Sequence, residues 1–149
     1  MTVLRKIAQI IYQYPKVTAF GTLFSQLGAL DLQYKLAYNH KFIMSYVNDV
    51  KQDEYLKNNS EQGVVIIYSN SGNYLNKYQL SSFDEKKKYD YKNKKVILIT
   101  ANEMMVNHPD VDICLVYQHL SKLQTHSYIY PLINDLIVAE YRSFQNANF

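Results

Sequence analysis

The sequence predicts an α/β domain, a three-layer α-β-α sandwich in which a five-stranded parallel sheet lies between two layers of helices. Five short runs are apolar on consecutive residues, as in strands that are covered on both faces. These runs are Val17–Gly21, Phe42–Tyr46, Val64–Tyr68, Val96–Thr100 and Ile113–Tyr117. Most segments between them have apolar residues at helical spacing, and alternating strands and helices give parallel strands joined by right-handed crossovers.

The first helix is expected over residues 2–14, before the first strand. Leu4, Ile7 and Ile11 recur there at helical spacing, so they share one face. After the third run, a helix is expected to begin near Tyr74. Between the fourth and fifth runs, the segment Ala101–Asp112 is short and contains a proline, so only a turn or two of helix is expected.

Two further helices carry longer apolar stripes, one after the first run and one after the last. The first stripe consists of Leu23, Leu27, Leu30 and Tyr34. The second consists of Ile129, Leu132, Ile133, Leu136 and Ile137. Each stripe is interpreted as core, and contact with a second copy of the chain is the alternative.

Length and composition indicate one globular domain over residues 1–149, with its core in residues 15–144. Hydrophobic residues make up 48% and charged residues 19% of the 149 residues, which is normal for a chain long enough to bury a core. The net charge of +3 does not by itself favour a nucleic-acid partner. No apolar run reaches the roughly 18–20 residues needed to cross a bilayer, so no membrane contact is expected.

The sequence has no recognisable metal or nucleotide site. No His or Cys pair has metal-ligand spacing, and both the P-loop and the full glycine pattern of a dinucleotide site are missing. Cys114 is the only cysteine and lies in an apolar run, which indicates a core residue and a reducing, cytoplasmic location. No cofactor and no metal are therefore expected.

Small polar residues follow the third run, in the order Ser69-Asn70-Ser71-Gly72-Asn73. A strand that ends in hydroxyl residues before a helix suits an anion, because free N–H groups at a helix start attract negative charge. Ser69 and Ser71 can donate hydroxyls there, and Gly72 lets the backbone pass close to a ligand. The alternative is an ordinary turn in which Ser71 caps the helix.

The segment Val64–Gly72 resembles the hallmark of the sugar-isomerase (SIS) domain, an apolar strand that runs into Ser-x-Ser-Gly. Lys95–Thr100 and Asp110–Val116 are similar to the next two strands of that family. Val17–Gly21, with Ser25 four residues on, is similar to its first strand and loop. The resemblance covers nearly the whole chain and implies the flavodoxin-like strand order 2-1-3-4-5.

Within the SIS family, the flanks of the domain resemble the C-terminal half of RpiR-type transcriptional regulators. The resemblance lies in the lead-in helix Ile7–Tyr14 and the closing stretch Ser127–Arg142. In those regulators this domain senses a phosphosugar, and a preceding helix-turn-helix domain binds DNA. No helix-turn-helix precedes Met1, so DNA binding is expected only through a domain that this chain lacks, and a homodimer is the expected assembly.

The same resemblance implies a phosphosugar site at the ends of the first and third predicted strands. The implied binding residues are Ser25, Ser69, Asn70, Ser71, Gly72 and Tyr74. The three serines would hold the phosphate through their hydroxyls, and Asn70 and Gly72 would supply backbone contacts. Leu23, Tyr74 and Asn76 depart from the family pattern, where a glycine, a threonine and an acidic residue are usual.

No catalytic residue is expected. Isomerases of this fold need a base near the sugar carbonyl, and the candidates are His40, His108, His119 and His126. His40 lies at the wrong end of the predicted sheet, and His108 lies in a turn. His119 and His126 follow the fifth run, where a ligand contact is the alternative to a surface role.

Three functions remain, in order of preference. The first is a phosphosugar-binding regulatory domain of the RpiR type, without enzymatic activity. The second is a degenerate SIS fold retained for dimerisation alone, which the departures at Leu23, Tyr74 and Asn76 motivate. A sugar-phosphate isomerase ranks last, because no acid or base is clearly placed.

Overall fold

The computed structural model describes residues 1–58, 62–80, 86–119 and 127–147. Four parallel strands form one sheet in the order β1-β2-β3-β4. The strands are β1 (Val17–Gly21), β2 (Gly63–Tyr68), β3 (Lys94–Thr100) and β4 (Ile113–Val116). The α-helices are α1 (Val3–Gln13), α2 (Phe24–Ala37), α3 (Asp49–Lys57) and α4 (Tyr130–Ala147). Three short 3-10 helices complete the described part: η1 (Asn73–Asn76), η2 (Glu103–Asn107) and η3 (Ser127–Ile129). The predicted α/β fold with a parallel sheet is confirmed.

The prediction of a fifth strand at Phe42–Tyr46 is wrong. This segment lies beside β1, where the Met44 N–H donates to the Val17 carbonyl at 3.0 Å and the Ala19 N–H to the Met44 carbonyl at 2.9 Å. The pairing stops at this single bridge. Phe42 and Met44 are 75% and 54% exposed, so the segment lacks the cover on both faces that holds a buried parallel strand. It still occupies the outer position, next to β1, that the expected strand order gives it.

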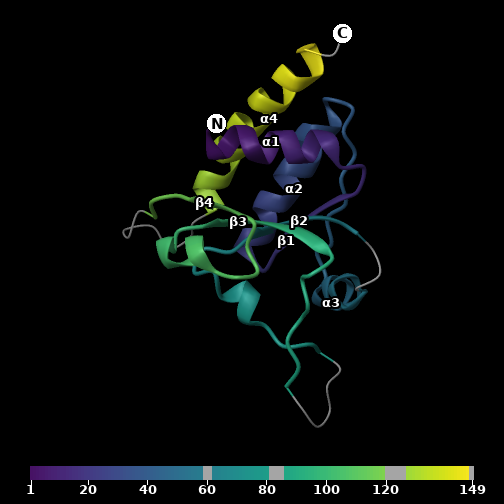
Figure 1. The fold of residues 1–149 in the computed structure, drawn as a ribbon, viewed down its shortest axis with the longest axis vertical. Helices are drawn as coiled ribbons and strands as arrows, with labels where there is room; N and C mark the ends of the chain where they lie inside the picture. The colour runs from purple at the N-terminus through teal and green to yellow at the C-terminus, as the bar shows by residue number, and fades with distance from the viewer. Residues whose placement is uncertain (59–61, 81–85, 120–126, 148–149) are drawn as a thin grey trace.

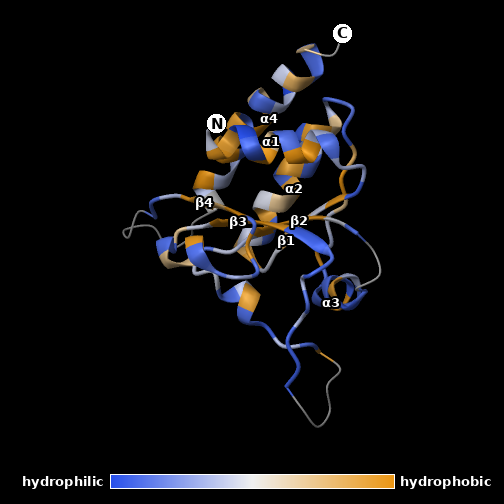
Figure 2. Ribbon diagram, in the orientation of Figure 1, coloured by the Kyte–Doolittle hydropathy of each residue, from blue (hydrophilic) through white to orange (hydrophobic). Residues whose placement is uncertain are grey.

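Helices α1, α2 and α4 lie together on one side of the sheet, and α3 lies on the other (Figure 1). Strand residues alternate between the two sides, because successive side chains of a strand point to opposite faces. Ala19 and Ile66 are fully buried under the three helices. Phe20 and Ile67 are fully buried on the α3 side, where Leu56 of α3 packs against them. The strands therefore form an apolar centre between more polar surfaces, as Figure 2 shows.

The α2 stripe does not face the core. Leu23, Leu27 and Tyr34 are 88%, 52% and 67% exposed, so the interpretation of this stripe as core is wrong. The inner face of α2 carries Leu32 and Leu36 beside smaller residues, among them Gly28. A Cβ added to Gly28 would lie 2.7 Å from the ring of Tyr130, so the glycine lets α4 approach α2 closely.

The α4 stripe is mostly core, as interpreted from the sequence. Ile133 and Ile137 are buried in the cluster between the three helices and the sheet, while Leu132 and Leu136 are exposed. The lead-in helix α1 also agrees with the prediction and begins after Thr2, whose hydroxyl accepts a hydrogen bond from the Arg5 N–H. No helix in the described ranges has the length and apolar character needed to cross a membrane.

The helix predicted from Tyr74 is only the four-residue η1. Tyr74 and Leu75 are consecutive in the sequence, and both are buried in the cluster on the α3 side of the sheet. Their burial does not follow the spacing of three to four residues that the buried face of a helix shows. Lys77 is already extended, and the Gln79 N–H donates to the Lys87 carbonyl at 2.7 Å. The expected short helix between β3 and β4 is present as η2.

Candidate functional site

The loop after β2, Ser69–Gly72, holds two serine hydroxyls that keep a proton to donate. The Ser69 hydroxyl accepts a hydrogen bond from the Tyr74 N–H at 3.3 Å, and the Ser71 hydroxyl accepts one from the Asn73 N–H at 3.2 Å. In the described part of the chain, neither hydroxyl proton has an acceptor. A hydroxyl can accept and donate at the same time, so both serines cap η1 and remain donors.

Backbone amides of the same loop are also unoccupied. Among the described residues, the N–H groups of Asn70 and Ser71 donate no hydrogen bond. The Gly72 N–H, in contrast, donates to the Ser69 carbonyl at 3.1 Å and is not available to a ligand. Free amides and hydroxyls on one tight loop are the donors that anion sites use.

Gly72 is required by the protein's own packing. Its φ of +81° lies in the left-handed region, which favours glycine. A Cβ at this position would lie 2.6 Å from Cγ of Met105 in η2. The space that a side chain would fill is therefore occupied by Met105. The backbone conformation and this contact account for a glycine at position 72 without a ligand.

Residues at the end of β3 hold the loop in place. The Thr100 hydroxyl donates to the Asn70 carbonyl at 3.0 Å, and the Ala101 N–H donates to the same oxygen at 2.9 Å. The Asn102 side-chain amide donates to the Ser71 carbonyl at 2.9 Å. The Asn70 carbonyl shares its peptide group with the Ser71 amide, and the Ser69 carbonyl, which accepts the Gly72 N–H, shares its peptide group with the Asn70 amide. Both peptide groups that carry these amides are therefore held before any ligand binds.

The loop after β1 uses its polar groups internally. The Gly21 N–H donates to Oε1 of Gln26 at 2.8 Å, and the Gly21 carbonyl accepts from Nε2 of Gln52 at 2.9 Å. Ser25 is 5% exposed, and its hydroxyl lies 3.3 Å from the Tyr130 hydroxyl. Leu23, with a φ of +53°, is turned into solvent. Ser25 therefore lies in the protein interior and not on an open phosphate site.

A chain of hydroxyl groups joins the two loops. From Ser25 it passes to Tyr130, from there to the Tyr117 hydroxyl at 3.0 Å, and on to Oδ1 of Asn70 at 2.8 Å. Burial raises the pKa of both tyrosines, so both stay neutral donors at physiological pH. The structure thus connects two of the sequence-predicted residues, Ser25 and Asn70, through two tyrosines that the sequence reasoning missed.

Tyr74 is not placed to bind a ligand with its phenol. Its side chain is buried on the α3 side of the sheet, 5.5 Å from the ring of Phe20 between centroids. Its hydroxyl donates to Oε1 of Gln52 at 2.5 Å. Burial raises the pKa of Tyr74, so this hydroxyl stays protonated. Only the Tyr74 amide reaches the loop, through Ser69.

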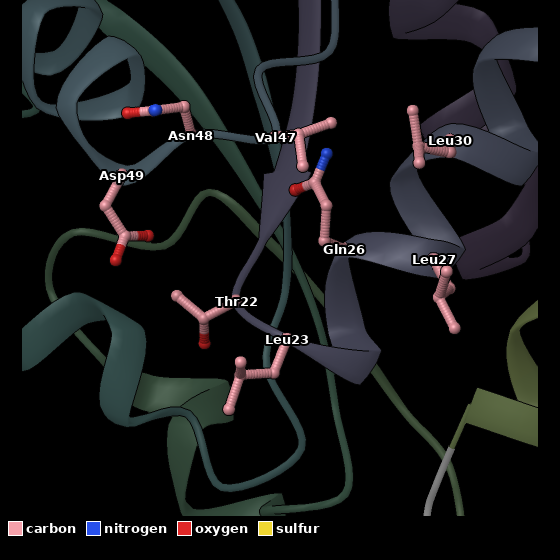
Figure 3. A pocket seen from close by; sticks show the side chains of 8 residues that line it. All are labelled: Thr22, Leu23, Gln26, Leu27, Leu30, Val47, Asn48 and Asp49. Carbon is pink, nitrogen blue, oxygen red and sulfur yellow. The ribbon is translucent and has the colours of Figure 1, made fainter.

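A groove of about 480 Å³ lies beside the carboxyl end of β1 (Figure 3). Its lining comes from the loop after β1, from α2 and from the start of α3. The lining residues are Thr22, Leu23, Gln26, Leu27, Leu30, Val47, Asn48 and Asp49. Its one charged group is the carboxylate of Asp49, and no residue of the loop after β2 lines it. Half of the lining residues are apolar and the single charge is negative, so the groove does not suit an anion.

The histidines form no evident catalytic group in the described part of the chain. His40 is exposed with a φ of +63°, and Nδ1 of His108 accepts the Asp110 N–H at 3.1 Å. The ring of His119 lies 6.5 Å from that of Tyr128, and His126 lies outside the described residues. No group of three potential metal ligands occurs in the described ranges. Cys114 is half-buried, and burial raises the pKa of its thiol.

The fold is shared with solved structures, although no protein-family model and no curated protein matches the sequence. A Bacteroides fragilis protein named a "putative phosphosugar isomerase involved in capsule formation" has a TM-score of 0.69 at 16% identity, over 98% of this chain and 81% of its own. A Listeria monocytogenes "putative sugar-phosphate isomerase" has a TM-score of 0.64 at 15% identity, over 97% of this chain and 77% of its own. An E. coli CFT073 protein in complex with arabinose 5-phosphate has a TM-score of 0.65 at 16% identity, over 96% of this chain and 76% of its own. At these identities the likeness establishes the fold.

Proposed function

We propose that this chain is a phosphosugar-sensing SIS domain of the kind found in RpiR-type transcriptional regulators, and that it is not an enzyme. The observation that carries the proposal is the loop after β2. There the hydroxyl protons of Ser69 and Ser71 and the amides of Asn70 and Ser71 have no acceptor among the residues that the structure describes. The solved proteins of this fold named above support a phosphorylated sugar as the ligand, and the expected setting is the cytoplasm.

In the proposed complex, the phosphate oxygens accept hydrogen bonds from Ser69, Asn70 and Ser71. The loop needs little reorganisation, because Thr100 and Asn102 already hold its carbonyls, and such preorganisation reduces the free-energy cost of binding. Ser25 and Tyr74 are left out of the ligand set, since their hydroxyls bond to Tyr130 and Gln52.

A sensor also needs a route from the ligand to the rest of the domain. Asn70 has one backbone N–H, which donates no hydrogen bond among the described residues, and its side-chain Oδ1 accepts the Tyr117 hydroxyl. Tyr117 in turn contacts Tyr130 at the start of α4. A ligand that binds more tightly to one arrangement of this chain shifts the population toward it. Helix α4 packs against the lead-in helix α1, which would carry that change toward a preceding DNA-binding domain.

The direct test is calorimetric titration of the protein with inorganic phosphate and with arabinose 5-phosphate and other sugar phosphates. We expect one saturable site, with affinity about tenfold or more lower in Ser71→Ala, because hydrogen bonds to charged groups contribute about 1.5–3 kcal/mol. Ser143→Ala is the matched control, since this hydroxyl lies on α4 and bonds to Glu140 and Arg5. Absence of binding by every sugar phosphate, or equal binding by Ser71→Ala, would contradict the proposal.

A second candidate is a domain retained for dimerisation alone. It is favoured by the loop after β1, where Ser25 is bonded inward and Leu23 replaces the usual glycine. This function requires self-association without phosphate affinity. The titration above separates the two, because only the sensor releases or absorbs heat with a sugar phosphate.

A third candidate, sugar-phosphate isomerase, rests on the names of the solved proteins of this fold. His40 and His108 precede the edge segment and β4 in the chain, away from the carboxyl ends where the loop lies. An aldose–ketose conversion assay tests it. Turnover that Ser71→Ala reduces would replace the sensor proposal with an enzyme.

A further inference from the structure

Two limbs of the chain between η1 and β3, residues 77–80 and 86–90, form a ribbon that extends from the sheet on the side opposite α1 and α4 (Figure 1). Tyr78 and Lys88 pair in an antiparallel bridge, and the Gln79 N–H donates to the Lys87 carbonyl at 2.7 Å. Nε2 of Gln79 adds a hydrogen bond to the Lys88 carbonyl at 3.1 Å. These two limbs are called the arm below.

The arm is fixed to α3 through the buried carboxylate of Asp53. One oxygen of Asp53 accepts the Leu80 N–H of the first limb at 3.0 Å and the Tyr89 hydroxyl of the second limb at 2.5 Å. The other oxygen pairs with Nζ of Lys57 at 2.9 Å. Because one carboxylate holds both limbs, the arm presents its outer side chains in a fixed arrangement, and such preorganisation reduces the free-energy cost of binding a partner.

The net positive charge of the chain is concentrated in and beside the arm. Residues 77–95 contain seven lysines and three acidic residues, a net charge of +4, so the other residues together have a net charge of −1. In the described ranges, no carboxylate forms an ion pair with Lys86, Lys87 or Lys88. Like charges on one segment repel each other, and a negatively charged partner relieves that repulsion.

The outer face of the arm combines an aromatic ring with two ammonium groups. In an antiparallel pair, directly opposed side chains and those two residues away share a face, so Tyr78 lies on the face of Lys88 and Lys86. Nζ of Lys86 and Nζ of Lys88 lie 5.5 Å and 5.9 Å from the centre of the Tyr78 ring. Tyr78 is 44% exposed, whereas Tyr89 is turned toward α3. The ring is therefore open to a ligand beside two cations.

This arrangement matches a single strand of nucleic acid. Lys86 and Lys88 are two residues apart on one limb, which separates their Cα atoms by about 6.7 Å, close to the spacing of successive phosphates along a nucleic-acid strand. An exposed ring beside the phosphate contacts lets a base stack, as in proteins that bind single strands without sequence preference. In a duplex, the bases stack on one another and their faces are not open to the ring.

An anionic membrane fits the arm less well. A bilayer is broad and flat and would meet the whole segment, and the sequence between the two limbs contains Asp84 and Glu85. Anionic lipids attract basic residues and repel acidic ones. A nucleic-acid strand, in contrast, needs only the face that carries Tyr78.

We infer that the arm binds single-stranded nucleic acid, with the ammonium groups of Lys86 and Lys88 on successive phosphates and the Tyr78 ring stacked on a base. This activity goes beyond the proposed function and does not depend on it, because the arm and the loop after β2 share no residue. A domain that binds no sugar phosphate would still bind such a strand.

The test is fluorescence anisotropy of a labelled oligothymidylate of roughly 16 nucleotides, titrated with the full chain from about 50 to 200 mM salt. We expect binding that weakens with salt. Lys86→Gln combined with Lys88→Gln should reduce the slope of log affinity against log salt by about 1.4, because each phosphate contact on a single strand contributes about 0.7. Lys6→Gln combined with Arg142→Gln is the matched control, since it removes two exposed positive charges on α1 and α4 and leaves the same net charge.

The stacking contact is tested separately from the charges. Tyr78→Ala should lower the affinity about tenfold at every salt concentration, whereas Tyr78→Phe should keep the wild-type affinity, because stacking needs the ring and not the hydroxyl. Circular dichroism checks that each variant is folded.

Four results would each overturn the inference. They are no binding of the oligonucleotide at the lowest salt, a loss in the control variant equal to that in the arm variant, unchanged affinity in Tyr78→Ala, and tighter binding to a duplex of the same length. Binding to phosphatidylserine vesicles in place of the oligonucleotide would assign the arm to a membrane surface instead.

Discussion

The loops after β1 and β2 leave the same edge of the sheet one strand apart, and both contain a serine proposed from the sequence to bind phosphate. In the loop after β1, the Gly21 amide, the Gly21 carbonyl and the Ser25 hydroxyl all have partners inside the protein. In the loop after β2, Ser71 is exposed and its amide and hydroxyl proton have no partner among the described residues. Serines near the ends of neighbouring strands are thus used differently. In the first loop the polar groups bond to other groups inside the protein, and in the second loop some donors have no partner among the described residues.

The difference teaches that a serine after a strand is not enough to define a ligand site. The deciding feature is whether the protein's own groups occupy the donors. The Ser25 hydroxyl is bonded to Tyr130. Thr100 and Asn102, in contrast, bind the carbonyls of Asn70 and Ser71, and among the described residues the N–H groups of Asn70 and Ser71 donate no hydrogen bond. Substitutions in the first loop should therefore affect stability, and those in the second should affect binding.

The largest effect is expected from Gly21→Ala. The new Cβ would lie 2.5 Å from the Tyr68 carbonyl oxygen and 2.9 Å from Cβ of Ser25, and the backbone of a central strand cannot move away easily. We expect a loss of about 3 kcal/mol in the free energy of unfolding, at the upper end for overpacking. Urea denaturation measures it, with Gly63→Ala as control, where the nearest atom is 3.2 Å away. An equal loss of unfolding free energy in the two variants would show that Gly21 is no more tightly packed than Gly63.

A smaller loss is expected for Gly72→Ala. Here the close contact is with the side chain of Met105, which is flexible and can shift. The left-handed φ of +81° remains and costs a residue with a side chain about 1–2 kcal/mol. The same denaturation series should place this variant between Gly21→Ala and Gly63→Ala. A loss larger than that of Gly21→Ala would reverse the comparison of the two loops.

Removing the hydroxyl of Tyr130 should cost about 1 kcal/mol, the net value of a typical buried hydrogen bond. Tyr130→Phe leaves the Ser25 and Tyr117 hydroxyls without this partner. A double-mutant cycle with Ser25→Ala measures the coupling, and it should be positive and close to the single effects. Additive losses would mean that the hydroxyl chain is not a coupled unit.

Ser71→Ala, at an exposed position, should change stability by less than about 0.5 kcal/mol.

The smallest expected effect concerns pH. Burial tends to raise the pKa of Asp53, but hydrogen bonds from Lys57, Tyr89 and the Leu80 amide outweigh it and hold the pKa below its usual value. A carboxyl whose folded-state pKa is lowered contributes stability above its unfolded-state pKa, near 3.9, and loses it as the pH falls through the folded-state value. Asp53→Asn should therefore flatten the acid limb of stability below about pH 4. Unfolding midpoints between neutral and acidic pH measure this, and an unchanged acid limb would contradict it.

The sequence predicted four strands because each is a continuous apolar run; β1, β2 and β3 are buried on both faces, whereas β4 is only partly covered. It failed at Phe42–Tyr46, where apolar residues are exposed on an edge segment and composition alone cannot show that cover is missing. It also failed for α2, because helical spacing identifies a stripe but not the direction it faces. The inner face of α2 combines Leu32 and Leu36 with small or polar residues, namely Ser25, Gln26, Gly28 and Ala29, which dilute its hydrophobic signal.

The site was predicted in part. The loop Ser69–Gly72 was located from the strand-end hydroxyls and the glycine, which are local signals. Its supporting residues come from distant segments, so no local pattern marks Asn102 or Tyr130. Tyr117 could have been found, because it ends an apolar run at the same edge of the sheet. The position of the Tyr74 phenol depends on Gln52 of α3, which lies 22 residues earlier in the chain.

The most direct test of the proposed phosphate site in the loop after β2 is nuclear magnetic resonance of the backbone amides during titration with inorganic phosphate and arabinose 5-phosphate. The amide signals of Asn70 and Ser71 should show the largest saturable shifts. In Ser71→Ala the same shifts should need about tenfold more ligand or more, while the spectrum of the folded domain stays otherwise intact. Saturable shifts confined to the groove beside α2, or none at any amide, would contradict the assignment of the free donors to an anion.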